Sequence, residues 1–287
     1  METITSAQNP KIKNLLLLQE KSRARREQGL FVVEGRRELE HCLEAGFKVR
    51  TLFVCPEIFG SIADEGTPLP RPSAAGPSLL SGRGWPEILD TVPSSAEAVI
   101  EIPEALYRKV AYRESTEGII AEVEYKERGL QDLNLPDNPL IMVLEAVEKP
   151  GNLGAVLRSA DAAGAHAVLI CDPLTDLYNP NLIRASIGAV FTVPTVACSS
   201  EEAIAFLQSH DIQILTAQLQ DSSLYYDIDM RRGTALVMGT ESTGLTDVWR
   251  RAASAHIRIP MLGRLDSLNV SVSAAILLFE AVRQRQI

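Results

Sequence analysis

Apolar segments alternating with helical patterns dominate the second half of the chain and constrain its fold most. Mostly apolar segments predict strands at 140–144, 167–170, 193–196, 213–217, 234–238 and 256–259. Patterns typical of helices lie between them, at 153–163, 182–189, 201–209 and 246–252. Continuous apolar strands that alternate with helices indicate a parallel sheet covered on both faces. We therefore expect an α/β fold that binds ligands beyond the carboxyl ends of its strands.

The first half of the chain is predicted to be a smaller α/β unit. Its expected helices are 5–28, 36–45 and 104–110, and its expected strands are 31–33, 49–55, 99–102 and 119–125. The stretch 56–95 is rich in Pro, Gly and Ser, which predicts a loop insertion. Residues 127–139 are polar and contain Pro and Gly, as linkers do. We expect one domain at 1–126 and another at 140–287, joined by this linker.

Composition argues against several classes of protein. The four Cys and four His form neither a C-x-x-C nor an H-x-x-x-H pair, so we expect no metal site. No N-terminal apolar signal and no apolar run suited to a membrane span occur, so we expect a cytosolic protein without a membrane partner. The net charge of -9 is opposite to the usual footprint of nucleic-acid binding.

The charge is distributed unevenly along the chain. Residues 1–37 carry eight basic and four acidic side chains, a local net charge of +4. Such a cluster is either a solvated helix face or a patch that binds nucleic acid. Both interpretations fit the sequence at this point.

Polar residues gather after three of the predicted strands. Residues 148–154 follow the first strand and lead into a helix that bears Arg158; the glycines in this segment permit a tight turn and close backbone approach. Residues 239–245 follow another strand and include Glu241, which would be costly if it were buried unpaired. Residues 259–271 follow the last strand and precede an apolar helix over 272–282. Free amide donors at such a helix start are typical of a small-ligand pocket.

Each of these polar residues also has a simpler interpretation. Ser267 and Asn269 fit a helix cap, and Arg158 fits a surface ion pair with Asp161 three residues later. Arg184 fits either phosphate and sugar contacts or a solvated helix start. Neither G-x-G-x-x-G nor G-K-[ST] occurs in the expected places, which disfavours a nicotinamide or ATP cofactor and a Rossmann oxidoreductase.

Taken together, the three segments resemble the motifs of the SpoU/TrmH family of RNA 2′-O-ribose methyltransferases, within the SPOUT superfamily. Motif one is similar to residues 151–164, motif two to 237–245 and motif three to 259–271. Their order along the chain makes the set specific, although each motif alone is weak. The resemblance covers about 140–287. The first half resembles the family's ribosomal-protein-like RNA-binding domain, notably at residues 31–35.

The resemblance implies a fold, a reaction and partners. The fold is a parallel-sheet α/β trefoil-knot domain preceded by a smaller ribosomal-protein-like α/β domain that binds the RNA substrate. The reaction transfers a methyl group from S-adenosylmethionine to a ribose 2′-hydroxyl. The N-terminal domain favours ribosomal RNA over transfer RNA as the substrate. The resemblance also implies a homodimer with its active site near the subunit interface.

The resemblance also implies roles for individual residues. The catalytic arginine is Arg158, and its supporting polar residues are Asn152, Glu241, Ser267 and Asn269. Cofactor contacts are expected at Gly239, Ile259, Met261 and Leu268. RNA contacts are expected at Lys11, Lys13, Arg23, Arg25, Arg26, Arg36 and Arg184.

Two departures and one alternative accompany this interpretation. Lys149 replaces the usual Asp or Asn before the Pro-Gly of motif one, and residues 240–243 replace the usual Asn-Glu-Gly-Glu. A guanidinium is a poor base. Arg158 therefore either acts together with a substrate phosphate to remove the proton of the ribose 2′-hydroxyl, or only orients that hydroxyl. The alternative is an RNA-binding protein of the same fold that lacks activity.

Overall fold

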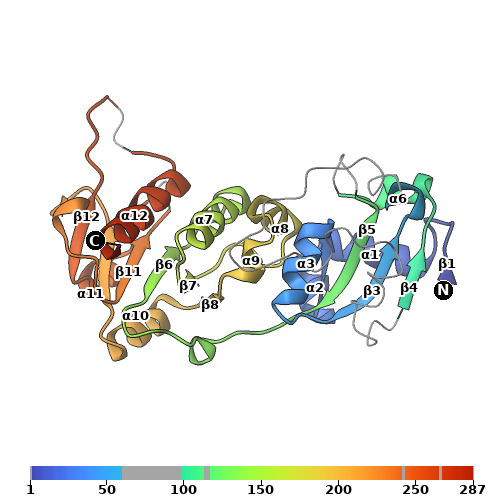
Figure 1. The fold of residues 1–287 in the computed structure, drawn as a ribbon, viewed down its shortest axis with the longest axis horizontal. Helices are drawn as coiled ribbons and strands as arrows, with labels where there is room; N and C mark the ends of the chain where they lie inside the picture. The colour runs from blue at the N-terminus through green and yellow to red at the C-terminus, as the bar shows by residue number, and fades with distance from the viewer. Residues whose placement is uncertain (1, 60–97, 113–116, 241–242, 265–266, 287) are drawn as a thin grey trace. The chain divides into compact units, whose positions relative to one another are not determined.

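The computed structural model describes residues 2–59, 98–112, 117–240, 243–264 and 267–286. The chain divides into two compact units, the first holding residues 1–126 with 178–183 and the second 127–177 with 184–287 (Figure 1). From residue 60 onward, the predicted insertion 56–95 lies outside the described residues. Among the described helices, none combines the length and apolar character that crossing a membrane requires.

The first unit is built on a mixed five-stranded sheet. Across the sheet the order is β1 (Glu2–Thr3), β4 (Ala98–Glu101), β3 (Val49–Val54), β5 (Ile119–Glu124) and β2 (Leu30–Glu34). Strand β5 runs antiparallel to both of its neighbours, and the remaining pairs are parallel. The helices given by its described residues are α1 (Pro10–Glu20), α2 (Ser22–Gln28), α3 (Arg36–Glu44) and α6 (Glu104–Val110). Ile12, Leu15 and Leu18 bury one face of α1 in the core of this unit.

The single helix predicted over 5–28 is wrong, because the structure has two helices there. The first begins at Pro10, where the Asn9 side chain accepts a hydrogen bond from the Lys11 amide. The chain becomes extended at Lys21, which separates the two helices. Arg25 then donates to the carbonyls of Leu18 and Gln19 at 2.7 and 3.1 Å, which satisfies the end of the first helix.

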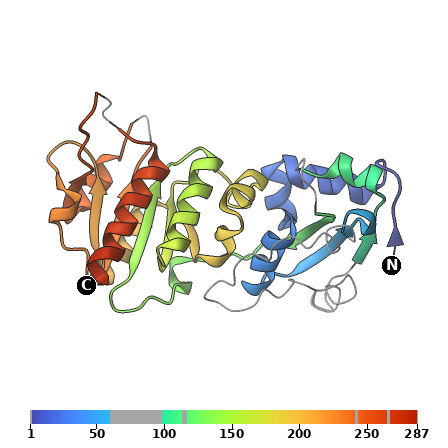
Figure 2. The ribbon, with the colours of Figure 1, turned by 45° about the horizontal axis from the view of Figure 1, so that its top comes forward.

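The second unit is an all-parallel seven-stranded sheet, as the alternating pattern predicts. Its order is β10 (Ser223–Leu224), β12 (Ala255–Arg258), β9 (Gln213–Ala217), β11 (Thr234–Met238), β6 (Leu140–Glu145), β7 (Ala167–Cys171) and β8 (Thr195–Cys198). Helices α7 (Pro150–Ala162) and α12 (Val270–Arg285) pack side by side over one face (Figure 2). Helices α10 (Ser200–Ser209) and α11 (Asp247–Ala252) cover the other. Short helices α8 (Pro180–Ser186) and α9 (Ala189–Thr192) precede β8.

The strands of this sheet do not lie in the order in which they occur along the chain, and this difference positions the site. The last strand, β12, lies inside the sheet between β10 and β9. The segment after it therefore starts beside β10 and β9 and ends at α12, which packs on α7 and β11. Residues from three distant parts of the sequence meet where these elements end. This arrangement positions the site described below.

Arg285 anchors the C-terminal helix, and we expect its replacement by alanine to destabilise the second unit. Its guanidinium donates to the carbonyls of Asn138, Pro139, Met230 and Arg232 at 2.8 to 3.1 Å. Hydrogen bonds from a charged donor contribute about 1.5–3 kcal/mol each, with strong overlap between neighbours. Arg285→Ala should lower the free energy of unfolding, measured in urea, by about 2–4 kcal/mol.

The matched control for this change is Arg231→Ala. Among the described residues, Arg231 pairs only with the exposed Asp229, at 2.9 Å, on the surface of the same unit. Exposed pairs add little to stability, so we expect the control to unfold like the unchanged protein. Equal unfolding curves for both variants would contradict an anchoring role for Arg285.

Candidate active site

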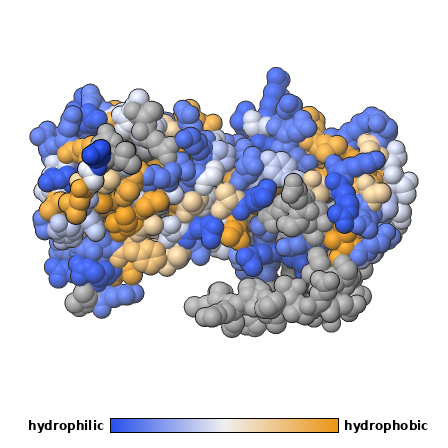
Figure 3. All heavy atoms as spheres, turned by 90° about the horizontal axis from the view of Figure 1, so that it is seen from above, coloured by the Kyte–Doolittle hydropathy of each residue, from blue (hydrophilic) through white to orange (hydrophobic). Residues whose placement is uncertain are grey.

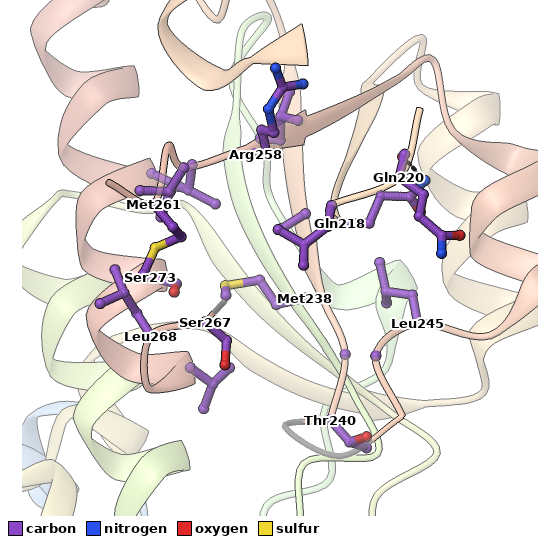
Figure 4. A pocket seen from close by; sticks show the side chains of 18 of the residues that line it. Gln218, Gln220, Met238, Thr240, Leu245, Arg258, Met261, Ser267, Leu268 and Ser273 are labelled. Carbon is purple, nitrogen blue, oxygen red and sulfur yellow. Dashed lines mark hydrogen bonds between the residues drawn. The ribbon is translucent and has the colours of Figure 1, made fainter. Parts of the chain in front are cut away.

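A cavity of about 600 Å³ opens at the carboxyl ends of β9, β11 and β12. Figure 4 shows Ser267, Leu268 and Ser273 on one side of it and Gln218, Gln220 and Leu245 on the other. Six of the residues singled out in the sequence line this cavity: Gly239, Ile259, Met261, Ser267, Leu268 and Asn269. The structure thus brings the second and third polar segments into one pocket, where the strand-end rule for parallel sheets places ligands.

The turn after β11 is closed too tightly for any side chain at its first residue. A Cβ added to Gly239 would lie 2.3 Å from the carbonyl carbon and oxygen of Gly244 and 2.6 Å from the Leu245 nitrogen. Inside the turn, the Thr240 hydroxyl lies 2.7 Å from that of Thr243. Backbone therefore forms this cavity wall, and only glycine fits at position 239. Glu241, which the family resemblance implies for this site, lies outside the described residues.

Glu145 holds the far end of the same turn. It is the last residue of β6 and only 3% exposed. Its carboxylate accepts hydrogen bonds from the Thr246 amide at 2.9 Å and from the Thr246 hydroxyl at 2.5 Å. These bonds fix the start of α11 relative to β6, so Glu145 positions the turn. Glu145 lies outside the three motifs and was not predicted from the sequence, although an acidic residue that ends an apolar strand is a recognisable signal.

Asn269 both caps a helix and joins two motifs. It is the N-cap of α12, and its Oδ1 accepts hydrogen bonds from the Ser271 amide at 3.0 Å and the Ser271 hydroxyl at 2.6 Å. Its Nδ2 donates to Oδ1 of Asn152 at 3.2 Å. The helix-cap interpretation of Asn269 is therefore confirmed, and the same side chain also joins α12 to α7. Ser267, exposed at the cavity, lies outside α12 and is not its N-cap.

Asn152 lies within a helix rather than in the loop before it. Helix α7 begins at Pro150, three residues earlier than the predicted start at 153, because proline is favoured in the first turn. Gly154 was expected to let the backbone approach a ligand closely, but its neighbours indicate a packing role. A Cβ there would lie 2.5 Å from the Ala185 Cβ and 2.7 Å from the Ser186 nitrogen, so this glycine lets α8 pack on α7.

Arg158 projects from the exposed side of α7, six residues beyond Asn152. The simple alternative, an ion pair with Asp161, is not formed in the described structure, where Asp161 accepts a hydrogen bond from the Thr192 hydroxyl at 2.7 Å. Within the described residues, the guanidinium of Arg158 has no hydrogen bond or ion pair. Arg158 is not among the described residues that line the cavity. The Asn152–Asn269 bond joins its helix to the cavity wall, in addition to the packing of α7 against α12.

Most of the basic residues proposed for RNA contact are exposed in the first unit. Lys11 and Lys13 lie on α1, and Arg23 and Arg26 lie on α2. Lys11 pairs with Glu2, and Arg23 pairs with Glu27.

Arg25, Arg36 and Arg184 differ from that exposed group. Arg25 is only 2% exposed and binds carbonyls of its own unit, so we leave it out of any RNA-contacting surface. Arg36 is half-buried, with its guanidinium 4.9 Å from the centre of the Phe59 ring. Arg184 is exposed in the last turn of α8, in the second unit.

The sequence also matches known families and proteins. Residues 139–279 match the SpoU rRNA methylase family, and residues 9–121 match the MRM3-like substrate binding domain. Over 176 residues the chain is 42% identical to the Salmonella typhi 23S rRNA (guanosine-2′-O-)-methyltransferase RlmB, covering 59% of this chain and 72% of that protein. The chain belongs to the SpoU rRNA methylase family. The family predicted from the three motifs is thus confirmed.

Solved structures of SpoU-like enzymes have the same fold over nearly the whole chain. A crystal structure of an RNA 2′-O ribose methyltransferase is 38% identical, with a TM-score of 0.77 over 99% of this chain and 100% of that one. An AdoMet-bound rRNA methyltransferase from Sinorhizobium meliloti is 27% identical, with a TM-score of 0.83 over 98% of this chain and 97% of that one. The predicted α/β fold class is confirmed by these similarities and by the all-parallel sheet.

Proposed function

We propose that this SpoU-family protein transfers a methyl group from S-adenosylmethionine to a ribose 2′-hydroxyl of ribosomal RNA. The observation that carries the proposal is the cavity bounded by motifs two and three, joined through Asn269 and Asn152 to the helix that presents Arg158. Among the similar proteins named above, RlmB of Salmonella typhi is named as a 23S rRNA methyltransferase and the Sinorhizobium meliloti protein as an rRNA methyltransferase, which favours ribosomal over transfer RNA.

The cavity suits the proposed cofactor in size and in lining. Its volume of about 600 Å³ lies within the usual range for small-ligand sites. Met238, Leu245 and Ile257 provide an apolar surface for a flat base, and Gly239 exposes backbone beside it. Arg258, also in the lining, can meet a carboxylate. S-adenosylmethionine, when bound, supplies an electrophilic methyl group on a sulfonium.

The residues of the chain have separate tasks in this reaction. The guanidinium of Arg158 donates hydrogen bonds to ribose or phosphate oxygens and holds the 2′-oxygen in line for attack. Because a guanidinium is a poor base, Arg158 orients the hydroxyl, and the proton passes to a substrate phosphate oxygen or to water. Asn152 and Asn269 keep α7 and α12 in register so that Arg158 stays in place.

The first unit supplies the proposed RNA contacts. Residues 9–121 match a substrate-binding domain, and the exposed cations of α1 and α2 offer partners for phosphate groups. Lys11, Lys13, Arg23 and Arg26 form this surface, with Arg184 as a contact on the second unit. We propose that residues 1–126 bind the RNA and residues 140–287 carry out the methylation, in the cytoplasm.

We further propose that the protein is a homodimer that pairs through α12. Val272 and Phe279 lie seven residues apart on this helix and are 47% and 48% exposed, so they share one face. Hydrophobic residues, in orange, also gather on the second unit in Figure 3. Exposed apolar surface of this kind is typical of protein interfaces.

A charge on this face should separate the two copies. We expect Phe279→Glu to yield a monomer in sedimentation equilibrium, because an interface buries a carboxylate only at high cost. Leu174→Glu, at another exposed apolar residue, is the control and should leave the dimer intact. A dimer that survives Phe279→Glu unchanged would place the interface elsewhere.

The proposed activity is tested by transfer of a labelled methyl group from S-adenosylmethionine to unmodified rRNA and tRNA. Label in rRNA that resists alkali at one dinucleotide would support ribose methylation and locate the target. Label in tRNA alone would overturn the choice of substrate. Cofactor binding without transfer to either free RNA or ribosomal subunits would favour an RNA-binding protein that lacks activity.

A further inference from the structure

Two cysteines lie side by side at the carboxyl ends of β7 and β8. Cys171 and Cys198 are the last residues of these parallel strands and face each other in the register of the sheet. Their Sγ atoms are 4.0 Å apart, at the apolar core between the sheet and α10. Directly paired residues of neighbouring strands have Cα atoms about 4.8 Å apart, which lies within the range that a disulfide spans. The two sulfur atoms can therefore bond after rotation of the side chains, without movement of the strands.

Backbone hydrogen bonds hold both cysteines in this position. The Cys171 carbonyl accepts a hydrogen bond from the Ala146 amide at 2.9 Å, and the Cys198 carbonyl accepts one from the Asp172 amide at 2.9 Å. Strand β8 lies at the edge of the sheet formed by the described residues, where β7 is its one neighbour. A bond between the two sulfur atoms would therefore link this edge strand covalently to the rest of the sheet.

The two thiols differ in exposure and in acidity. Cys171 is fully buried, whereas Cys198 is partly exposed and within reach of a small oxidant. The hydrogen bond between the thiols lowers the pKa of Cys198 and raises the pKa of Cys171. Partial burial and the carboxylates of Glu202 and Asp172 oppose the shift in the pKa of Cys198 without reversing it. Because the thiolate is the reactive form, Cys198 is the residue that an oxidant meets first.

The other two cysteines of the chain provide an internal comparison. Cys42 and Cys55 are both buried in the first unit. Burial raises the pKa of Cys55 to about 11 and also raises the pKa of Cys42. Both therefore stay protonated at neutral pH, and a buried thiol in this form is inert.

We propose that Cys171 and Cys198 are a modification site, at which a hydroperoxide produces a reversible disulfide. The Cys198 thiolate attacks one oxygen of the peroxide, the O–O bond breaks, and the other oxygen leaves and takes up a proton. The Cys171 sulfur then attacks the sulfur of the resulting sulfenic acid, the S–O bond breaks, and water leaves with the Cys171 proton. Two thiols are thus oxidised and one peroxide is reduced. A dithiol reverses the bond by exchange, as is usual for disulfides in reducing compartments.

The test is mass spectrometry of the whole reduced protein after brief exposure to equimolar hydrogen peroxide. The remaining thiols are then blocked with N-ethylmaleimide in denaturant. Trypsin cleaves after Arg184, between the two cysteines, so the disulfide would join two peptides that are otherwise separate. We expect Cys171 and Cys198 to be lost together as thiols and to be restored by dithiothreitol. Cys42 and Cys55 should react at least about 10-fold more slowly.

Two variants distinguish the roles of the two sulfur atoms. In Cys171→Ser, peroxide should leave Cys198 as a sulfenic acid that dimedone traps. In Cys198→Ser, Cys171 should stay reduced, because it is buried. Peptides that stay separate in the oxidised unchanged protein would overturn the inference even if neither variant folds. Equal oxidation of all the cysteines, or linkage that forms only in denaturant, would also overturn it, because the folded sheet would then not direct the reaction.

Discussion

Replacing Arg158 by alanine is expected to reduce methyl transfer by at least about 100- to 1,000-fold, the usual range when an orienting or charge-stabilising group is removed. The guanidinium is exposed on α7 and has no partner among the described residues, so it is available to RNA. The measurement is the single-turnover rate of label transfer to the RNA substrate. Arg158→Lys should recover only part of the rate, because an ammonium lacks the planar fork of donors.

Cofactor binding distinguishes a catalytic role for Arg158 from a structural one. Arg158 is not among the described residues that line the cavity, so Arg158→Ala should bind S-adenosylhomocysteine with unchanged affinity. Arg231→Ala, an exposed arginine of the same unit, serves as the control and should keep full activity. A variant that loses cofactor affinity and thermal stability along with activity would show that Arg158 supports the fold.

Gly239→Ala is expected to weaken cofactor binding by at least about 30-fold, which corresponds to roughly 2 kcal/mol of strain. The added Cβ would lie 2.3 Å from Gly244 backbone atoms, so the turn must open and the cavity wall must move. This backbone is further held by Glu145 through Thr246, which limits how far it can relax. The measurement is the dissociation constant of S-adenosylhomocysteine by calorimetry.

A second glycine near the same cavity provides the matched control. A Cβ on Gly263, in the segment between β12 and α12, meets no atom within 4 Å. Gly263→Ala should therefore bind the cofactor like the unchanged protein. If Gly239→Ala binds S-adenosylhomocysteine as tightly as the unchanged protein does, the turn after β11 can move to accept a Cβ. The close contacts of Gly239 would then not determine the shape of the pocket.

Much of the fold was predictable because its signals are local. The bounds of α6, β9 and β11 agree with the sequence pattern to the residue, since buried strands and short helices have a characteristic length and composition. The three polar segments were also recognisable, because each directly follows a strand. The order of the motifs then identified the family, which the comparisons confirm.

The tertiary structure decided which side chains act together. Arg25 belongs to a basic run in the sequence but is buried against helix-end carbonyls, which only packing reveals.

Glu145 and Thr246 are 101 positions apart, and Asn152 and Asn269 are 117 apart. No local pattern encodes such pairs. They form only in the folded chain, where β12 lies between β10 and β9 and the following helix, α12, packs against α7. Residue types and strand ends were therefore determined by the sequence itself, whereas partners and burial depend on contacts between distant segments.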